Sequence, residues 1–172
     1  MTDRVAIVGS RTLTSAAART LVFKVVRRLA RNDPDVIVIS GGAAGIDSFA
    51  DEAYRQICRR RTVVHRPDWD THGKRAPLMR NQVIVDDATQ LVAIWDGASR
   101  GTLDSVRRAF EKGIPVFLWY EPWKKWVSTR GDILALTGPL ERERPDPRRK
   151  LRGEGAGPAV WGAMHRLRKR LA

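Results

Sequence analysis

The chain has 172 residues and a net charge of +13, and 42% of its residues are hydrophobic. These values fit one globular domain with at most a small addition, and no apolar run approaches the roughly 20 residues that a membrane-spanning helix needs. We therefore expect a cytoplasmic protein, in which the single cysteine, Cys58, excludes an internal disulfide and a cysteine-based zinc site.

The basic charge is distributed unevenly along the chain. Residues 1–120 contain 19 Lys/Arg and 13 Asp/Glu, whereas residues 121–172 contain 13 and 6. The shorter C-terminal part thus holds more than half of the excess positive charge. Such a charge favours phosphorylated ligands or polyanions as partners.

Short apolar runs alternate with amphipathic segments through the first 120 residues. Five apolar runs, most of them rich in β-branched residues, predict strands at residues 5–8, 36–39, 62–65, 91–95 and 115–119. The segments between them predict helices, the first capped by Thr14 or Ser15, the third spanning residues 78 to about 87, and the fourth ending at Gly113. This alternation predicts an α/β fold, an open and mostly parallel sheet with helices on both faces.

The loops that follow the predicted strands contain residues suited to binding an anion. In such sheets ligands bind beyond the carboxyl ends of the strands, and helix N-termini there offer free N–H groups. The first two loops supply Gly9, Ser10, Arg11, Ser40, Gly41, Gly42, Gly45 and Asp47 as candidates. The later loops and the third helix add Trp69, Arg80, Asn81, Asp96, Ser99, Gly101 and Thr102.

The glycines of "SGGAAGID" leave two interpretations open. They could allow a tight turn and close packing of strand on helix, or they could form a cradle for a phosphate. The spacing is not that of the dinucleotide fingerprint, and there is no Walker A lysine. Arg11 at the neighbouring junction favours phosphate, because a guanidinium can grip it with two hydrogen bonds.

Other candidates suggest how the rest of a nucleotide would be held. Asp96 could accept hydrogen bonds from a ribose, and the Ser99 and Thr102 hydroxyls could donate to a phosphate or ribose. Trp69, an aromatic residue in a polar loop, could stack on a base or form a small core contact. No His, Cys or carboxylate group has metal-ligand spacing, so we predict no metal site.

Several motifs, in order, resemble the SLOG superfamily, which includes DprA-like and LOG-like proteins, and are closest to its stand-alone YspA-type, cpYpsA-related members. The matching segments are "VAIVGSR", "SGGAAGIDSFADEA", "PDWDTHGK", "MRN" and "WDGASRGTLDSVRRAFEKGIPVFL". The resemblance covers roughly residues 4–119 and implies a Rossmann-like domain. It implies a ligand derived from a nucleotide, of the ADP-ribose or NAD type, and no required cofactor.

The same resemblance implies two alternative functions. LOG-like enzymes cleave the bond between base and ribose phosphate, but the glutamate of their G-T-x-x-E pattern is replaced here by Ser105. Asp104 and Asp96 are then the candidate catalytic carboxylates, and the sequence favours binding over catalysis. DprA-like proteins suggest binding of single-stranded DNA, with which the basic charge agrees.

The chain changes character after the fifth predicted strand. Residues 121–172 contain clustered tryptophans, a charged linker from Pro139, and a basic amphipathic helix over 158–172. That helix could dock on its own domain or on another subunit, or contact nucleic acid. We therefore expect a Rossmann-like nucleotide-binding domain at 1–120, a basic extension at 121–172, and a homo-oligomer that senses, carries or sequesters its ligand.

Overall fold

The computed structural model describes residues 2–127 and 130–137 of the chain. The chain divides into two compact units, Met1–Trp126 and Val127–Ala172. The predicted linker from Pro139 and the predicted helix over 158–172 lie outside the described residues. None of the helices in the described part is long and apolar enough to cross a membrane.

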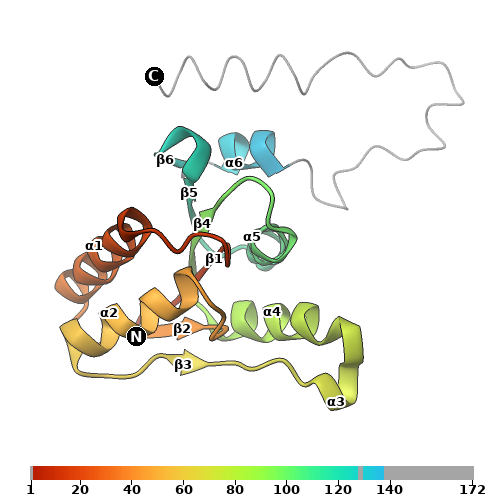
Figure 1. Ribbon diagram of the computed structural model, residues 1–172, viewed down its shortest axis with the longest axis horizontal. Coiled ribbons are helices and arrows are strands. Elements are labelled where there is room, and N and C mark those ends of the chain that lie inside the picture. Colours follow the sequence, from red (N-terminus) through yellow and green to blue (C-terminus); the bar gives the residue numbers. More distant parts are fainter. Residues whose placement is uncertain (1, 128–129, 138–172) are drawn as a thin grey trace, which may run out of the picture. The chain divides into compact units, whose positions relative to one another are not determined.

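A six-stranded sheet forms the centre of the fold, in the order β3-β2-β1-β4-β5-β6 (Figure 1). Its strands are β1 (Arg4–Gly9), β2 (Ile37–Ser40), β3 (Val63–Val64), β4 (Gln90–Trp95), β5 (Val116–Tyr120) and β6 (Lys125–Val127). The pairings β3-β2, β2-β1, β1-β4 and β4-β5 are parallel, so the predicted α/β class is confirmed. Strand order reverses between β1 and β4, which is where such sheets place their ligands.

The sixth strand was not predicted from the sequence. β6 has only three residues, and the run Lys125, Trp126, Val127 lacks both the length and the alternation by which a strand is recognised. The other five strands lie where their β-branched runs predict them.

Four long helices cover the two faces of the sheet. They are α1 (Ala16–Asn32), α2 (Ile46–Cys58), α4 (Ala76–Asp87) and α5 (Arg100–Lys112). The chain crosses the sheet in one direction from β1 to β3 and in the other from β3 to β5. Right-handed crossovers therefore place α1 and α2 on one face and α4 and α5 on the other. Within each pair the two helices pack against each other.

Shorter elements fill the connections. The loop before α4 folds into α3 (Trp69–His72) and the 3-10 turn η1 (Gly73–Arg75), and α4 begins two residues earlier than predicted. A second 3-10 turn, η2 (Glu121–Trp123), follows β5, and α6 (Arg130–Thr137) lies in the second unit. These short elements have too few residues to show a helical period in the sequence.

The core between the sheet and the α1/α2 layer fixes the strand ends in place. It includes Val5, Ile7, Val22, Val26, Val38, Ile46, Ala50, Ala53 and Ile94, all buried. Tyr54 of α2 is also buried, and its hydroxyl donates a 2.7 Å hydrogen bond to the carbonyl oxygen of Val36. Of the two predicted caps of helix α1, Thr14 and Ser15, the structure uses Ser15, whose hydroxyl accepts a hydrogen bond from the Ala18 N–H at 3.1 Å.

Candidate functional site

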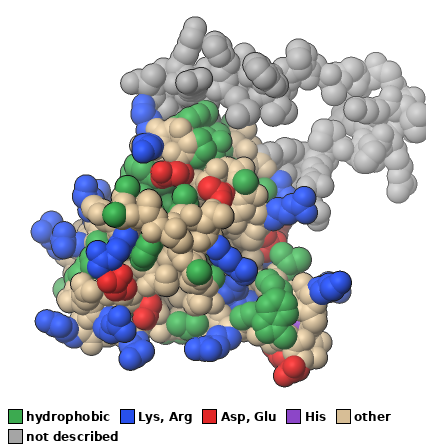
Figure 2. All heavy atoms as spheres, in the orientation of Figure 1, with side chains coloured by type: hydrophobic (Ala, Val, Ile, Leu, Met, Phe, Trp, Pro, Cys, Tyr) green, Lys and Arg blue, Asp and Glu red, His purple; other side chains and the backbone are tan. Residues whose placement is uncertain are grey.

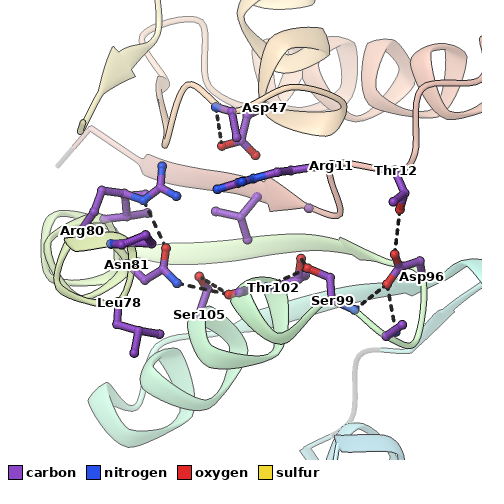
Figure 3. Close-up of a pocket in the computed structure, with 17 residues that line it drawn as sticks. Arg11, Thr12, Asp47, Leu78, Arg80, Asn81, Asp96, Ser99, Thr102 and Ser105 are labelled. Atoms are coloured by element: carbon purple, nitrogen blue, oxygen red, sulfur yellow. Dashed lines mark hydrogen bonds between the residues drawn. The ribbon is translucent and has the colours of Figure 1, made fainter. Parts of the chain in front are cut away.

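A pocket with a volume of about 520 Å³ lies beyond the carboxyl ends of β1 and β4 (Figure 3). It is lined by Val8, Gly9, Arg11, Thr12, Ala43, Asp47, Pro77, Leu78, Arg80, Asn81, Ile84, Asp96, Ala98, Ser99, Gly101, Thr102 and Ser105. The loops after β1, β2 and β4 therefore meet at one site, together with one face of α4. A volume of this size suits a small molecule or one unit of a polymer.

Gly41 lies directly beneath the side chain of Arg80. Nη1 of Arg80 donates a 2.6 Å hydrogen bond to the carbonyl oxygen of Gly41. A Cβ atom at position 41 would lie 1.8 Å from that nitrogen and 2.5 Å from Cζ of Arg80. Only glycine leaves room for the guanidinium to pack against the backbone here.

Gly45 and Gly9 allow the first two loops to approach each other closely. Gly45 has a φ of +76°, and a Cβ there would lie 2.8 Å from the carbonyl oxygen of Arg11. A Cβ on Gly9 would lie 2.5 Å from Cγ1 of Ile46, the first residue of α2. The chain can therefore pack the β1–α1 loop against the start of α2 only with glycine at both positions.

The amides of the glycine-rich loop are occupied by the protein's own side chains. Oδ2 of Asp47 accepts hydrogen bonds from the N–H groups of Gly41 at 3.0 Å and Ala43 at 3.3 Å. The hydroxyl of Ser40 accepts another from the N–H of Gly42 at 3.3 Å. Of the two interpretations left open by the sequence, close packing thus has the stronger structural support.

Asp47 is a buried carboxyl group with an altered pKa. Burial raises its pKa from 3.8 to about 6, against the opposing effects of the Ala43 hydrogen bond, the positive charge of Arg80 and hydrogen bonds from Gly41 and Gly9. A substantial fraction of the Asp47 carboxyl groups is therefore neutral at mildly acidic pH.

Two guanidinium groups approach the pocket from opposite walls. Burial lowers the pKa of Arg80, an effect that the charge of Asp47 opposes and that of Arg11 reinforces. Arg11 extends toward Asp47 and Arg80 (Figure 3), and among the described residues its guanidinium has no hydrogen-bond or ion-pair partner. The Arg11 guanidinium is therefore available to pair with an anion that enters the pocket.

The junction before α5 is braced by Asp96. Its Oδ1 accepts hydrogen bonds from the N–H groups of Ala98 at 2.9 Å and Ser99 at 2.8 Å, and its Oδ2 accepts one from the Thr12 hydroxyl at 2.8 Å. Burial acts to raise the pKa of Asp96, but these hydrogen bonds outweigh it and the pKa is lowered. Ser99 in turn caps α5, because its hydroxyl accepts a hydrogen bond from the Thr102 N–H at 3.4 Å. The Thr102 hydroxyl also donates to the Ser99 hydroxyl at 3.0 Å.

Asn81 connects α4 to the start of α5. Its Nδ2 donates hydrogen bonds to the Gly101 carbonyl oxygen at 3.2 Å and to Oδ2 of Asp104 at 3.0 Å. The same Asp104 oxygen accepts a 2.8 Å hydrogen bond from Arg108, and Asp104 does not line the pocket. Ser105 lines it instead, with its hydroxyl bonded to the Gly101 carbonyl oxygen. Of the two candidate catalytic carboxylates, Asp96 therefore lines the pocket and Asp104 does not.

Comparison with known proteins relates this site to a family. The family model for DNA recombination-mediator protein A matches residues 1–64, which include the loops after β1 and β2. The Gene 61 protein of Mycobacterium phage D29 is 37% identical over 119 residues, 66% of this chain and 93% of the phage protein. The chain belongs to the SLOG superfamily.

Solved structures with the same fold include further DNA-processing proteins. DprA from Streptococcus pneumoniae has a TM-score of 0.58 at 24% identity, over 68% of this chain and 50% of that one. DprA from Helicobacter pylori, solved to explain its single-stranded DNA binding mode, has a TM-score of 0.55 at 19% identity, over 99% and 82%. The protein TM1055 has a TM-score of 0.54 at 23% identity, over 66% and 72%. The match thus spans half the length of the Streptococcus protein.

The structure brings together most of the residues predicted to bind a ligand. Those that line the pocket are Gly9, Arg11, Asp47, Arg80, Asn81, Asp96, Ser99, Gly101 and Thr102. Those that do not are Ser10, Ser40, Gly41, Gly42, Gly45 and Trp69. Ser10 and Ser40 are fully buried beneath the loops, whereas Trp69 is 55% exposed on α3.

Sequence reasoning missed part of the lining. The added residues are Val8, Thr12, Ala43, Pro77, Leu78, Ile84, Ala98 and Ser105. Two of them had a usable signal, because Pro77 and Ile84 lie three or four positions from Arg80 and Asn81 and hence on the same face of α4. The described residues contain no group of three or more His, Cys, Asp or Glu side chains that could hold a metal ion.

Proposed function

We propose that the pocket binds the phosphate of a nucleotide unit, and that its ligand is single-stranded DNA. The observation on which this rests is the convergence of Arg11 and Arg80 on one cavity at the sheet's switch point. A phosphate placed between them would receive charge-assisted hydrogen bonds from both guanidinium groups and relieve their mutual repulsion.

The choice of DNA is supported by the relatives. The matching family model is that of a recombination mediator, and its match covers both loops that position Arg11 and Asp47. The comparison with the Helicobacter DprA structure adds the fold of a protein that binds single strands. These relatives favour the DprA-like alternative over the free nucleotide derivative that the sequence motifs alone imply first.

The test is an anisotropy titration with a labelled oligo(dT) of about 20 nucleotides, a length that spans a typical single-strand site. Arg11→Ala should weaken binding about tenfold or more, because a hydrogen bond to a charged group contributes about 1.5–3 kcal/mol. Arg66→Ala is the matched control, since Arg66 is exposed and does not line the pocket. Equal affinities for the two variants would reject the pocket as the binding site.

A free nucleotide of the ADP-ribose or NAD type is the second candidate. It is favoured by the shape of the site, in which Val8, Pro77, Leu78 and Ile84 offer an apolar wall to a base within a cavity of about 520 Å³. Under this alternative ADP-ribose would raise the melting temperature of the protein, and a saturating amount of oligo(dT) would not displace it. Under the DNA proposal the two ligands compete, and the oligonucleotide binds more tightly.

A further inference from the structure

The outer surface of α1 carries positive charge only. The helix contains five basic residues and no acidic residue. One of the five, Arg19, is paired with Glu52 of α2 at 2.6 Å. The other four, Lys24, Arg27, Arg28 and Arg31, are exposed.

These four cations form one stripe along the helix. Successive residues of an α-helix are rotated by about 100°, so positions 24, 27, 28 and 31 fall within about 100° of one another. The buried residues Ala18, Val22 and Val26 lie on the opposite side, against the core. The stripe is about 10 Å long, since each residue advances the helix by about 1.5 Å.

The neighbouring end of α2 extends this basic surface. Arg55, Arg59 and Arg61 are exposed, and α1 packs directly against α2. Arg60 beside them is paired with Asp35 at 3.1 Å. Figure 2 shows Lys and Arg side chains gathered on the left of the view, over α1 and α2. We use the term basic face for the exposed cations of this surface, which are Lys24, Arg27, Arg28, Arg31, Arg55, Arg59 and Arg61.

A structural role does not account for this arrangement. Within residues 2–127 and 130–137, no residue of the basic face forms an ion pair. Interaction with the helix dipole stabilises a cation only in the last turn, which explains Arg31 but not Lys24. Pairs such as Lys24 and Arg28, four residues apart, repel each other and destabilise the helix slightly. A bound polyanion would remove that repulsion.

We propose that the basic face binds the phosphate backbone of a nucleic acid, as a second contact surface separate from the pocket. One strand of DNA presents a negative charge about every 3.4 Å, so a 10 Å stripe faces about three phosphates at once. A row of flexible cations suits such a repeating anion without reading its sequence.

The surface chemistry favours nucleic acid over a membrane. Helices that lie on lipid bilayers insert large apolar side chains below their basic residues. The exposed large hydrophobic residues of the described chain are on β3, α3, α4, β5 and β6, and none is on α1 or α2. The apolar side of α1 is already used by the core.

The basic face and the pocket lie at different places in the fold. Helix α1 starts near the carboxyl end of β1, beside the pocket, and runs back along the sheet. Residues 24–31 occupy its second half, toward the amino ends of the strands. A strand held in the pocket by Arg11 therefore needs a separate path to reach this surface, and each site can be tested alone.

The experiment measures how the affinity for a labelled oligo(dT) of about 30 nucleotides changes between about 50 and 200 mM NaCl. The slope of log K against log salt reports the number of phosphates neutralised, at about 0.7 per contact for a single strand. The variant Lys24→Gln, Arg28→Gln, Arg31→Gln should lower the slope by about 2. A second variant, Lys24→Arg, Arg28→Lys, Arg31→Lys, keeps the charge and should keep the slope.

The control removes three exposed cations from another surface, in the variant Arg66→Gln, Lys74→Gln, Arg75→Gln. It should leave the slope nearly unchanged. An equal fall in both triple variants would mean that net charge alone attracts DNA and would overturn the proposal, as would an unchanged slope in the first. Tighter binding to vesicles rich in phosphatidylserine than to DNA would assign the surface to membranes instead.

Arg11→Ala distinguishes this proposal from that of the pocket. It should lower the affinity for oligo(dT) at every salt concentration and leave the contribution of the basic face to the slope in place.

Discussion

Asp47 makes the stability of the protein depend on pH in a direction opposite to that of most carboxylates. Its pKa in the folded protein is about 6, above the value of 3.8 for an unperturbed group, because the side chain is buried. The stabilisation is complete below the unfolded pKa and is lost as pH rises through about 6. Between pH 5 and pH 8 this group alone should remove roughly 1 kcal/mol of folding free energy.

Asp47→Asn tests this prediction, because the amide stays neutral and keeps an oxygen that accepts hydrogen bonds. Urea unfolding at pH 5 and pH 8 should show the wild-type protein losing roughly 1 kcal/mol more stability than the variant over this interval. Other titrating groups, such as the Asp87 carboxyl with its lowered pKa, are common to both proteins and cancel in the comparison. Parallel pH profiles for the two proteins would show that Asp47 stays ionised in the fold.

Gly41 should matter for binding through Arg80. A methyl group at position 41 would occupy the space of the guanidinium, so Gly41→Ala should displace Arg80 and weaken oligonucleotide binding about as much as Arg80→Ala does. The double variant should then be little worse than either single one, because both changes remove the same contact. Gly131→Ala introduces the same methyl group where nothing lies within 4 Å and serves as the control. Additive losses in the double variant would contradict this mechanism.

At the scale of elements, the sequence predicts the order of strands and helices along the chain better than it predicts the contacts between them. Five strands follow from β-branched runs, and their alternation with helices already implies that the loops share one edge of the sheet. The hydrogen bond from Arg80 to Gly41 joins positions 39 residues apart, and no local pattern indicates it. For the same reason the sequence leaves a phosphate cradle open as an interpretation of the glycines, since it does not show that the Asp47 carboxylate accepts hydrogen bonds from the N–H groups of Gly41 and Ala43.

Helix α5 links stability to binding through its cap. Ser99→Ala should destabilise the protein by about 1 kcal/mol, the usual loss for an N-cap, and should also weaken ligand binding because Ser99 orients Thr102 in the pocket. Ser15→Ala removes the equivalent cap from α1, and Ser15 does not line the pocket. Chemical denaturation should give similar losses for both, while only Ser99→Ala lowers affinity. A binding defect in Ser15→Ala as well would trace the effect to general destabilisation.

At the scale of the whole molecule, net charge and local sites contribute differently to binding. The pocket places two guanidinium groups where one phosphate can meet both, and it depends on the close approach of the chain at Gly9, Gly41 and Gly45. The wider excess of charge needs no such geometry, and its attraction falls off over a Debye length of about 8 Å at physiological salt. The net charge follows directly from the sequence. That four of the cations share one exposed face of α1 is known only once the structure shows which face of the helix is buried.

A chain that ends at Thr137 separates these contributions. Every residue that lines the pocket lies between Val8 and Ser105, whereas residues 138–172 contain 10 Lys/Arg and 4 Asp/Glu, a net charge of +6. The shortened chain should keep its affinity for a mononucleotide within about threefold, because a pocket holding one phosphate depends weakly on distant charge. Its affinity for oligo(dT) should fall and become less sensitive to salt, since fewer counterions are released on binding. Isothermal titration with each ligand measures both effects, and a loss of mononucleotide binding would mean instead that residues after Thr137 help to close the pocket.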